Sequence, residues 1–267
     1  MSSHNSYPLI DIGANLSHES FSGHLDQVID EAMQVGIEHI MVTGTSVTGS
    51  QDAFSLTGQY EDFLSSTCGV HPHEAHTCDK DALTALQGMA ENNKVKAVGE
   101  TGLDYFRDFS PRDKQRDAFA AQLELAVQLN MPIFLHQRDG HQDFISILRE
   151  YRNSLSRGVV HCFTGTKSEL EDYLELDMHI GITGWICDER RGHHLHEIVD
   201  LVPENRLMLE TDAPYLMPRN IRPKPKTRRN DPANLVWVLK TVAECLNKSE
   251  KAVAESTTAN ARDFFNL

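Results

Sequence analysis

The sequence predicts an α/β fold, a TIM (β/α)8 barrel, in which eight short parallel strands alternate with helices. Two observations predict it: short apolar runs recur along the whole chain, and each run is followed by a helix-length amphipathic stretch or a turn. The length of 267 residues is also typical of such a barrel. A doubly wound open sheet is the structural alternative, because it is built from the same alternation.

The predicted strands are short, and the stretches between them have helical periodicity. The strands are Leu9–Ile12, His39–Val42, Ser65–Val70, Lys96–Gly99, Ile133–Leu135, Val159–Cys162, His179–Ile182 and Leu207–Glu210. Helices are predicted at Leu25–Val35, Ala82–Glu91, Gln115–Leu129, Gln142–Tyr151, Ser168–Leu176 and His194–Val202, with closing helices at Pro232–Leu246 and Glu250–Phe264. No linker, low-complexity tract or repeat interrupts this alternation, so residues 1–267 are predicted to form a single domain.

The composition is typical of a globular protein, with 40% hydrophobic and 24% charged residues. No apolar run approaches the roughly 18–20 residues that cross a bilayer. The N-terminal residues have neither the basic start nor the apolar core of a secretory signal. The five cysteines are odd in number and lack CxxC spacing, which favours reduced thiols over disulfides. We therefore expect a cytoplasmic protein that does not enter membranes. No feature indicates a protein partner, and a monomer is the default expectation.

Positive charge is concentrated in one segment of an otherwise acidic chain. The net charge of −14 argues against broad coating of DNA. Six basic residues nevertheless fall between positions 219 and 229: Arg219, Arg222, Lys224, Lys226, Arg228 and Arg229. Prolines exclude a helix interior here, so the segment is predicted to be a loop downstream of Asp212. A solvated loop is one interpretation. The neighbouring acid favours the other, in which Arg222 and Lys224 contact substrate phosphates.

Four residues of metal-binding type follow four short apolar runs, Val95–Gly99, Pro132–Leu135, Gly158–Val160 and Arg206–Leu209. They are Glu100, His136, His161 and, after Glu210 and Thr211, Asp212. Because the C-terminal ends of the strands share one face of a barrel, these side chains are predicted to converge. The glycines on either side of Glu100 are expected to let the backbone turn and to leave room for a ligand. Mixed carboxylate and imidazole ligands suit magnesium, manganese or zinc. The pattern predicts a metalloenzyme.

Other polar and aromatic residues near these four have predicted roles. His71 and His73 alternate, so an extended backbone would point them the same way. Arg138 is interpreted either as a phosphate contact or as an ion-pair partner of Asp139. Asp104 is expected to form loop hydrogen bonds rather than to act as a second acid. Four aromatic residues could stack on an unpaired terminal base and so favour single-stranded ends, with ordinary packing as the other interpretation: Phe106, Phe163, Trp185 and Tyr215.

Five sequence blocks resemble the TatD family of metal-dependent deoxyribonucleases. They are HPHE at 71–74, GETGLDY at 99–105, LHQRD at 135–139, HCFTG at 161–165 and ETDAPY at 210–215, in order along nearly the whole chain. The resemblance implies a barrel of the metal-dependent hydrolase type. It also implies phosphodiester hydrolysis of DNA, and by extension RNA, from the 3′ end, with a role in DNA repair or degradation. Magnesium is the implied ion in use, with manganese or zinc as alternatives.

The resemblance also assigns roles to individual residues. It implies that Glu100, His136 and His161 are metal ligands and that Asp212 is a ligand or the catalytic base. His71 would face the phosphate.

The chain departs from the family pattern near its N-terminus. Many members have an Asp-x-His-x-His block that supplies two ligands for a second metal. This chain has Gly13 and Asn15 in place of those histidines, after Asp11, and so resembles the subgroup named after TatD itself. We therefore expect one firmly bound metal, with any second ion weakly held or brought by substrate phosphate.

The expected reaction is attack of water on phosphorus, with Asp212 as the general base. Glu100 and His71 complete the expected catalytic set, and the expected substrate contacts are His71, His73, Arg138, Arg222 and Lys224. One alternative is a hydrolase of small amides, esters or lactones on the same barrel. The other is a non-catalytic protein that binds nucleic acid. The basic segment favours a phosphate substrate, and the retained ligand set argues against loss of catalysis.

Overall fold

The computed structural model describes residues 7–267, and its eight strands form one sheet in which they follow each other in chain order. The strands are β1 Leu9–Ala14, β2 Ile37–Val42, β3 Leu64–Cys68, β4 Val95–Asp104, β5 Ile133–Arg138, β6 Gly158–Val160, β7 His179–Ile182 and β8 Leu207–Leu209. The pairs β3–β4, β4–β5, β5–β6 and β7–β8 are parallel. A (β/α)8 fold requires this strand order, whereas a doubly wound sheet would reverse it partway.

Helices lie between the strands in the chain and close it at the C-terminus. The α-helices are α1 Leu25–Gln34, α2 Val47–Thr57, α3 Lys80–Ala90, α4 Arg112–Leu129, α5 His141–Tyr151, α6 Lys167–Glu175, α7 His193–His196, α8 Leu235–Leu246 and α9 Glu250–Phe265. Short 3-10 helices are η1 Glu19–Phe21, η2 Pro72–Thr77, η3 Gly184–Cys187, η4 Val199–Leu201, η5 Glu204–Arg206 and η6 Pro232–Asn234.

Every predicted strand overlaps an observed one, and the predicted helices are confirmed with three differences. The closing helix predicted at Pro232–Leu246 starts as the 3-10 helix η6 and continues as α8. The stretch predicted as one helix at His194–Val202 is divided between α7 and η4. Helix α2 is absent from the prediction, because glycine and polar residues weaken its apolar periodicity. Its N-terminus is capped by Ser46, whose hydroxyl accepts a hydrogen bond from the Gly49 N–H at 3.0 Å.

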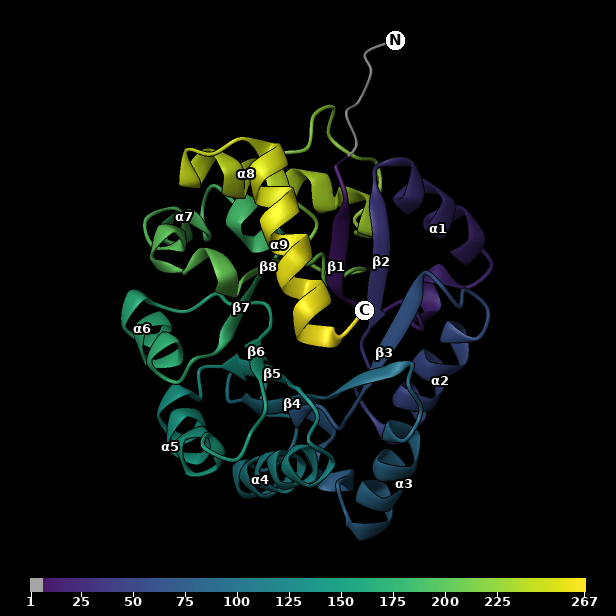
Figure 1. Ribbon diagram of the computed structural model, residues 1–267, viewed down its shortest axis with the longest axis vertical. Helices are drawn as coiled ribbons and strands as arrows, with labels where there is room; N and C mark the ends of the chain where they lie inside the picture. The colour runs from purple at the N-terminus through teal and green to yellow at the C-terminus, as the bar shows by residue number, and fades with distance from the viewer. Residues whose placement is uncertain (1–6) are drawn as a thin grey trace. The chain divides into compact units, whose positions relative to one another are not determined.

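The chain divides into two compact units, Val42–His179 and the residues up to Met41 together with Ile180–Leu267. In the first unit, helices α2 to α6 lie beside strands β3 to β6, and α4 packs against β4 (Figure 1). In the second unit, α9 packs against β1 and β8, and Ala14 of β1 forms a parallel bridge with Ala213. The single domain predicted over 1–267 stays a prediction. Most of the N-terminal stretch without a secretory signal falls in residues 1–6, outside the described residues.

The core of the Val42–His179 unit is built from strand and helix side chains that exclude water. Val98, Phe134 and Val160 lie on three neighbouring strands and are at most 2% exposed. Phe119 of α4 stacks on Phe144 of α5, with ring centroids 4.7 Å apart. Burial on both faces is typical of parallel strands covered by helices. The strands that carry the predicted ligands of this unit are thus held by packing.

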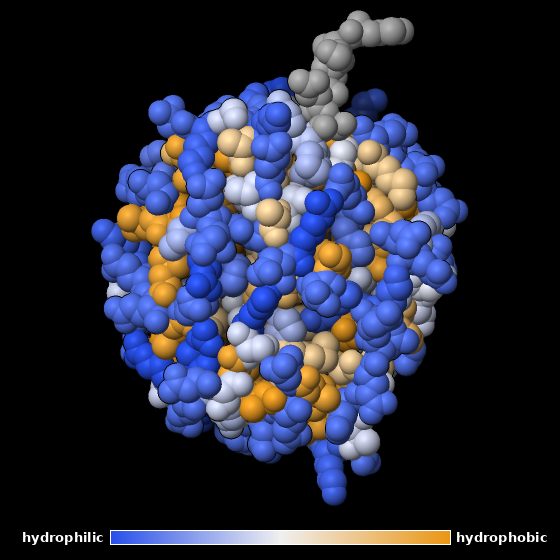
Figure 2. Space-filling model, in the orientation of Figure 1, coloured by the Kyte–Doolittle hydropathy of each residue, from blue (hydrophilic) through white to orange (hydrophobic). Residues whose placement is uncertain are grey.

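The face of the molecule in view agrees with the polar composition of the chain (Figure 2). Figure 2 shows a mainly hydrophilic face with smaller, separated hydrophobic areas. Within residues 7–267, no helix combines the length and the apolar character needed to span a membrane. No disulfide joins the cysteines of this part of the chain.

Candidate metal centre

Glu100 lies inside β4, and not after its end as predicted. His136 likewise lies within β5, whereas His161 follows β6 as expected. Val98 of β4 pairs with Ile133 of β5, and Thr101 pairs with Leu135, so β4 contains one residue more than β5 between these pairs. This irregularity is a β-bulge that includes Glu100. A bulge redirects the side chains of a strand, so Glu100 does not follow the simple alternation expected from the sequence.

The glycines beside Glu100 allow β4 to approach β5 closely. Gly99 and Gly102 have φ of 130° and 147°, a region that favours glycine. A Cβ atom at Gly99 would overlap the carbonyl oxygen of Phe134, and one at Gly102 would overlap that of His136. The space beside these two glycines is therefore occupied by the β5 backbone, while room for a ligand at the Glu100 carboxylate stays a prediction. The close packing instead fixes the strand of Glu100 against the strand of His136.

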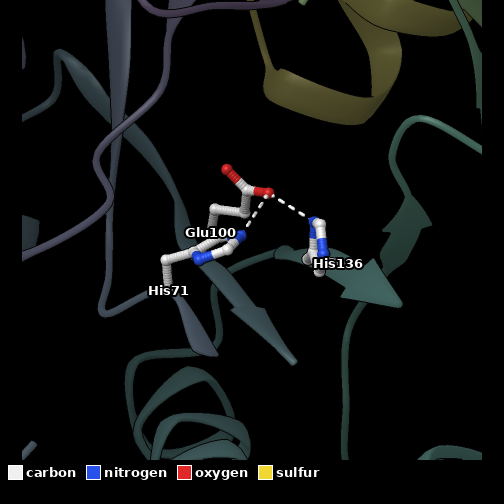
Figure 3. Close-up of side chains that lie close together, drawn as sticks. All are labelled: His71, Glu100 and His136. Carbon is white, nitrogen blue, oxygen red and sulfur yellow. Dashed lines mark hydrogen bonds and ion pairs between the residues drawn. The ribbon is translucent and has the colours of Figure 1, made fainter. Parts of the chain in front are cut away.

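Three imidazole nitrogens meet at one oxygen of the Glu100 carboxylate. Glu100 Oε1 lies 2.8 Å from His136 Nδ1, 2.9 Å from His161 Nε2 and 3.4 Å from His71 Nε2 (Figure 3 shows His71 and His136). Burial by itself raises the pKa of Glu100. Electrostatic interactions with His161 and His71 and the hydrogen bonds from His136 and His161 outweigh burial and hold this pKa well below its usual value. Glu100 is therefore an ionised carboxylate.

This arrangement fits a divalent cation. The ligand atoms of His71, Glu100 and His136 lie within 4.8 Å of one another, and His161 also contacts Glu100. His136 Nε2 is buried and has no hydrogen-bond partner in the described residues, since Asp104 Oδ2 is 3.6 Å away. A buried carboxylate surrounded by imidazoles is a ligand set that divalent metals use.

His71 has a geometry that suits hydrogen-bond donation better than metal binding. The prediction of an extended backbone is wrong, because Pro72 starts the 3-10 helix η2 and His71 caps it. His71 Nδ1 accepts a hydrogen bond from the His73 N–H at 3.1 Å. A backbone N–H can only donate, so the proton of the neutral ring is on Nε2, which faces Glu100. Burial lowers the pKa of His71 to about 4, so the ring is neutral at pH 7.

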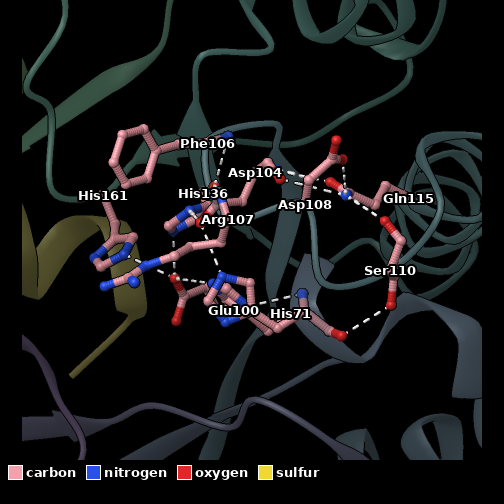
Figure 4. A network of polar contacts seen from close by, with 11 residues as sticks. His71, Glu100, Asp104, Phe106, Arg107, Asp108, Ser110, Gln115, His136 and His161 are labelled. Carbon is pink, nitrogen blue, oxygen red and sulfur yellow. Dashed lines mark hydrogen bonds and ion pairs between the residues drawn. The ribbon is translucent and has the colours of Figure 1, made fainter.

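Asp104 connects the loop after β4 with two histidines (Figure 4 shows much of this network). Its Oδ1 accepts hydrogen bonds from the N–H groups of Phe106 and Arg107 at 3.0 and 2.8 Å, which confirms the predicted loop role. Its Oδ2 lies 2.8 Å from His73 Nε2. Burial raises the pKa of Asp104, but the neighbouring His136 and the hydrogen bond from His73 lower this pKa more. His71 and His73 therefore contact different carboxylates, which the sequence pattern does not reveal.

Arg138 stacks on an aromatic ring. Its guanidinium carbon lies 3.7 Å from the centroid of Phe106, and no ion pair with Asp139 forms within residues 7–267. The ion-pair interpretation is wrong, and the phosphate contact stays a prediction. Phe163 is buried, at 4% exposure, so its predicted stacking on a base is also wrong. Phe109, which no sequence motif singles out, is 66% exposed.

Asp212 lies in the other unit, in the segment after β8. Both residues that replace the family histidines contact it. Its N–H donates to the Gly13 carbonyl at 2.8 Å, and its Oδ1 accepts from Asn15 Nδ2 at 3.1 Å. The preceding residue, Thr211, donates its N–H to buried Asp11 at 2.9 Å. Burial raises the pKa of Asp11 to about 7 although hydrogen bonds from Thr211 lower it. The roles of Asp212 as ligand or base stay predictions.

The basic segment Arg219–Arg229 is an irregular loop, as predicted. Three of its side chains form ion pairs within their own unit: Arg219 with Asp188 at 3.3 Å, Arg222 with Glu189 at 3.8 Å and Arg229 with Asp231 at 3.2 Å. The other three, Lys224, Lys226 and Arg228, are exposed and have no acidic partner in the part of the chain that the structure describes. Arg222 and Lys224 therefore differ in their surroundings, although the sequence pattern groups them together.

Parallel strands in chain order and a carboxylate–imidazole centre place this protein among the (β/α)8 hydrolases. The model of the family described as TatD related DNase matches residues 10–266. The chain belongs to this family, and the family resemblance seen in the sequence blocks is confirmed.

Curated relatives match over nearly the full length. Proteins named 3′-5′ ssDNA/RNA exonuclease TatD from Erwinia tasmaniensis and Edwardsiella piscicida are each 46% identical over 259 residues, which cover 97% of this chain and 100% of each relative. A protein of the same name from Pantoea ananatis is 44% identical over the same shares of the two chains.

Solved structures confirm the predicted fold class. A TatD family hydrolase from Entamoeba histolytica, at 26% identity, and the TatD homolog YJJV from Escherichia coli, at 27%, each give a TM-score of 0.88. Each comparison covers 97% of this chain and 98% of the other.

Proposed function

We propose that this chain is a divalent-metal-dependent nuclease that removes nucleotides from the 3′ end of single-stranded DNA and RNA. The observation that carries the proposal is the meeting of three imidazoles at the buried Glu100 carboxylate, in a member of the TatD related DNase family. The relatives named as 3′-5′ ssDNA/RNA exonucleases support the direction and the substrate.

Glu100, His136 and His161 would hold the metal ion, and Asp212 would be a fourth ligand or the base. When bound, the ion supplies positive charge that polarises a phosphate oxygen and activates water. Two observations support this ligand set. His136 and His161 each direct a ring nitrogen at Glu100, and the Glu100 carboxylate is ionised. Magnesium is the proposed ion, with manganese and zinc as the alternatives to test.

His71 would stabilise the negative charge that develops on the phosphate, and Asp212 would act as the general base. The neutral His71 ring presents an Nε2–H group at the centre, so it can donate a hydrogen bond to a phosphate oxygen as negative charge develops. Asp212 would accept the proton of the attacking water. The hydrogen bond from Asn15 restricts the Asp212 carboxylate and supports a positioned base.

Substrate contacts are proposed for His73, Arg138, Arg222 and Lys224. Arg138 and Lys224 have no carboxylate partner within residues 7–267, so their charges are available to phosphates. His73 is held by Asp104 beside His71, with the two imidazole centroids 4.2 Å apart. We further propose a cytoplasmic monomer whose physiological work is DNA repair or degradation.

The test follows cleavage of 5′-labelled single-stranded and duplex oligonucleotides by metal-stripped protein. Magnesium, manganese and zinc are added back separately, and Glu100→Ala is assayed in parallel. We expect a ladder that shortens from the 3′ end, faster on single strands, only with metal and only with the unsubstituted protein. Absence of cleavage with every metal would contradict the proposal and favour the small-molecule hydrolase or the non-catalytic binder.

A further inference from the structure

Two exposed phenylalanines lie on the loop that follows β4. Phe106 is 55% exposed and Phe109 is 66% exposed. The loop is nevertheless held firmly, because Asp104 accepts hydrogen bonds from the N–H groups of Phe106 and Arg107, and Ser110 Oγ donates to the His73 carbonyl at 2.8 Å. Solvent-exposed aromatic rings on a loop that hydrogen bonds hold in place form a surface that is preorganised to bind a ligand.

Phe106 adjoins the metal centre through Arg138. Arg138 and His136 are two residues apart on β5, so their side chains leave the same face of the strand about 6.6 Å apart along it. The Arg138 guanidinium carbon lies 3.7 Å from the centroid of the Phe106 ring, and that of Arg107 lies 5.9 Å from the same centroid.

The charges beside this ring complement a nucleic-acid strand. Within residues 7–267, the guanidinium groups of Arg138 and Arg107 have no carboxylate partner, although the chain as a whole carries a net charge of −14. A single strand presents phosphates and bases in alternation. The guanidinium groups can bind its phosphates, and the exposed ring beside them can stack on a base.

Phe109 reaches the same centre through a second series of contacts. Its ring meets His73 edge-on with centroids 4.7 Å apart, and the rings of His73 and His71 have centroids 4.2 Å apart. His71 Nε2 in turn faces Glu100 at 3.4 Å. Asp104 contacts both groups of residues, because its carboxylate accepts a hydrogen bond from the Phe106 N–H and lies beside the ring of His73, which contacts Phe109. The Phe109 ring is thus linked to the Glu100 centre by ring contacts, and Phe106 lies beside Arg138 and is held by Asp104.

We propose that Phe106 and Phe109 form a stacking surface for unpaired bases next to the phosphate that is cleaved. This inference rests on the proposed function and explains its preference for single strands. A base in a duplex is stacked between its neighbours and paired, so its face is not available to a protein ring. A base at an unpaired end exposes its face and can stack without regard to sequence.

The experiment compares the holoenzyme with two double variants, Phe106→Leu/Phe109→Leu and Phe106→Tyr/Phe109→Tyr. The first keeps apolar side chains but removes both rings, and the second keeps the rings. The two substrates are oligothymidylate and the same oligonucleotide with abasic residues at its three 3′-terminal positions. Binding is measured by fluorescence anisotropy, and cleavage by kcat and KM, after thermal unfolding has confirmed that each variant is folded.

We expect the unsubstituted protein and the tyrosine variant to bind oligothymidylate more tightly than the abasic strand. The leucine variant should lose roughly tenfold in affinity for oligothymidylate per ring. Its affinity for the abasic strand should equal that of the unsubstituted protein. In the cleavage assay with oligothymidylate, the leucine variant should have a higher KM and an unchanged kcat.

Three results test this inference, and the first and the third separate it from the nuclease proposal. A leucine variant that keeps the full preference for bases, while the unsubstituted protein cleaves, would overturn the stacking surface and leave the nuclease proposal intact. Equal binding of both strands by the unsubstituted protein would overturn the stacking surface as well. Base-dependent binding that disappears in the leucine variant, without cleavage by any protein, would support stacking and refute the nuclease proposal.

Discussion

The candidate metal centre and the basic segment both contain several charged or ionisable side chains, but the surroundings of these side chains are opposite. At the centre, Glu100 is 5% exposed and three imidazoles surround one of its oxygens. In the segment Arg219–Arg229, Lys224, Lys226 and Arg228 extend into water without an acidic partner in residues 7–267. Electrostatic interactions are strong and directional in the first environment, whereas water and salt screen them in the second.

This difference indicates which task each region can perform. Buried groups in fixed positions can stabilise a particular arrangement of charge, which chemistry requires. Exposed cations attract phosphates of any sequence and release them easily, which suits movement along a strand. Substitutions at the centre should therefore strongly reduce turnover, while substitutions in the segment should change affinity and its salt dependence.

The largest effect is expected from Glu100→Gln. Loss of this charge leaves three imidazoles around a neutral amide, so metal affinity should fall and kcat/KM should decrease on the order of 10³-fold or more. Calorimetric titration with manganese and the oligonucleotide assay measure the two effects. Glu91→Gln is the matched control, because Glu91 is an exposed carboxylate at the C-terminal end of α3. Unchanged metal binding and turnover in Glu100→Gln would refute the proposed centre.

Asp212→Asn should have the next largest effect. The amide cannot accept the proton of the attacking water, so we expect kcat to fall by about 10²-fold while manganese affinity changes less. Single-turnover cleavage at saturating metal isolates this step. Asp200→Asn serves as the control, because Asp200 is exposed in η4. Full activity of Asp212→Asn at saturating metal would show that Asp212 is not the base.

The smallest effect is expected from Lys224→Ala in the basic segment. An exposed cation contributes little, so KM for a single strand should rise about threefold with kcat unchanged. The slope of log affinity against log salt concentration should fall by about 0.7, the value for one phosphate contact on a single strand. Binding titrations across a series of salt concentrations measure this slope. Lys80→Ala removes the same charge from an exposed position at the start of α3, and an equal change in that variant would contradict a specific role for Lys224.

Much of the fold and of the centre could be predicted from the sequence, because the signals involved are local. Apolar runs and helical periodicity depend on neighbouring residues, so every predicted strand has an observed counterpart. Glu100, His136 and His161 were predicted from their positions near strand ends, and they do converge. Helix α2 escaped prediction because its local signal is weak.

The contacts among these residues depend instead on how distant segments pack. The bulge at Glu100 follows from the register between β4 and β5, and the His71 tautomer follows from the turn that Pro72 starts. Asp104 meets His73 across 31 positions of the chain, and Arg138 of β5 meets Phe106 of the loop after β4.

The amino-acid order thus specified which strands form and which types of ligand they carry, because propensity and apolar pattern are properties of short segments. Folding of the whole chain specified which nitrogen faces which oxygen and which rings stay exposed. Those features depend on register between strands and on close packing, which no short segment contains.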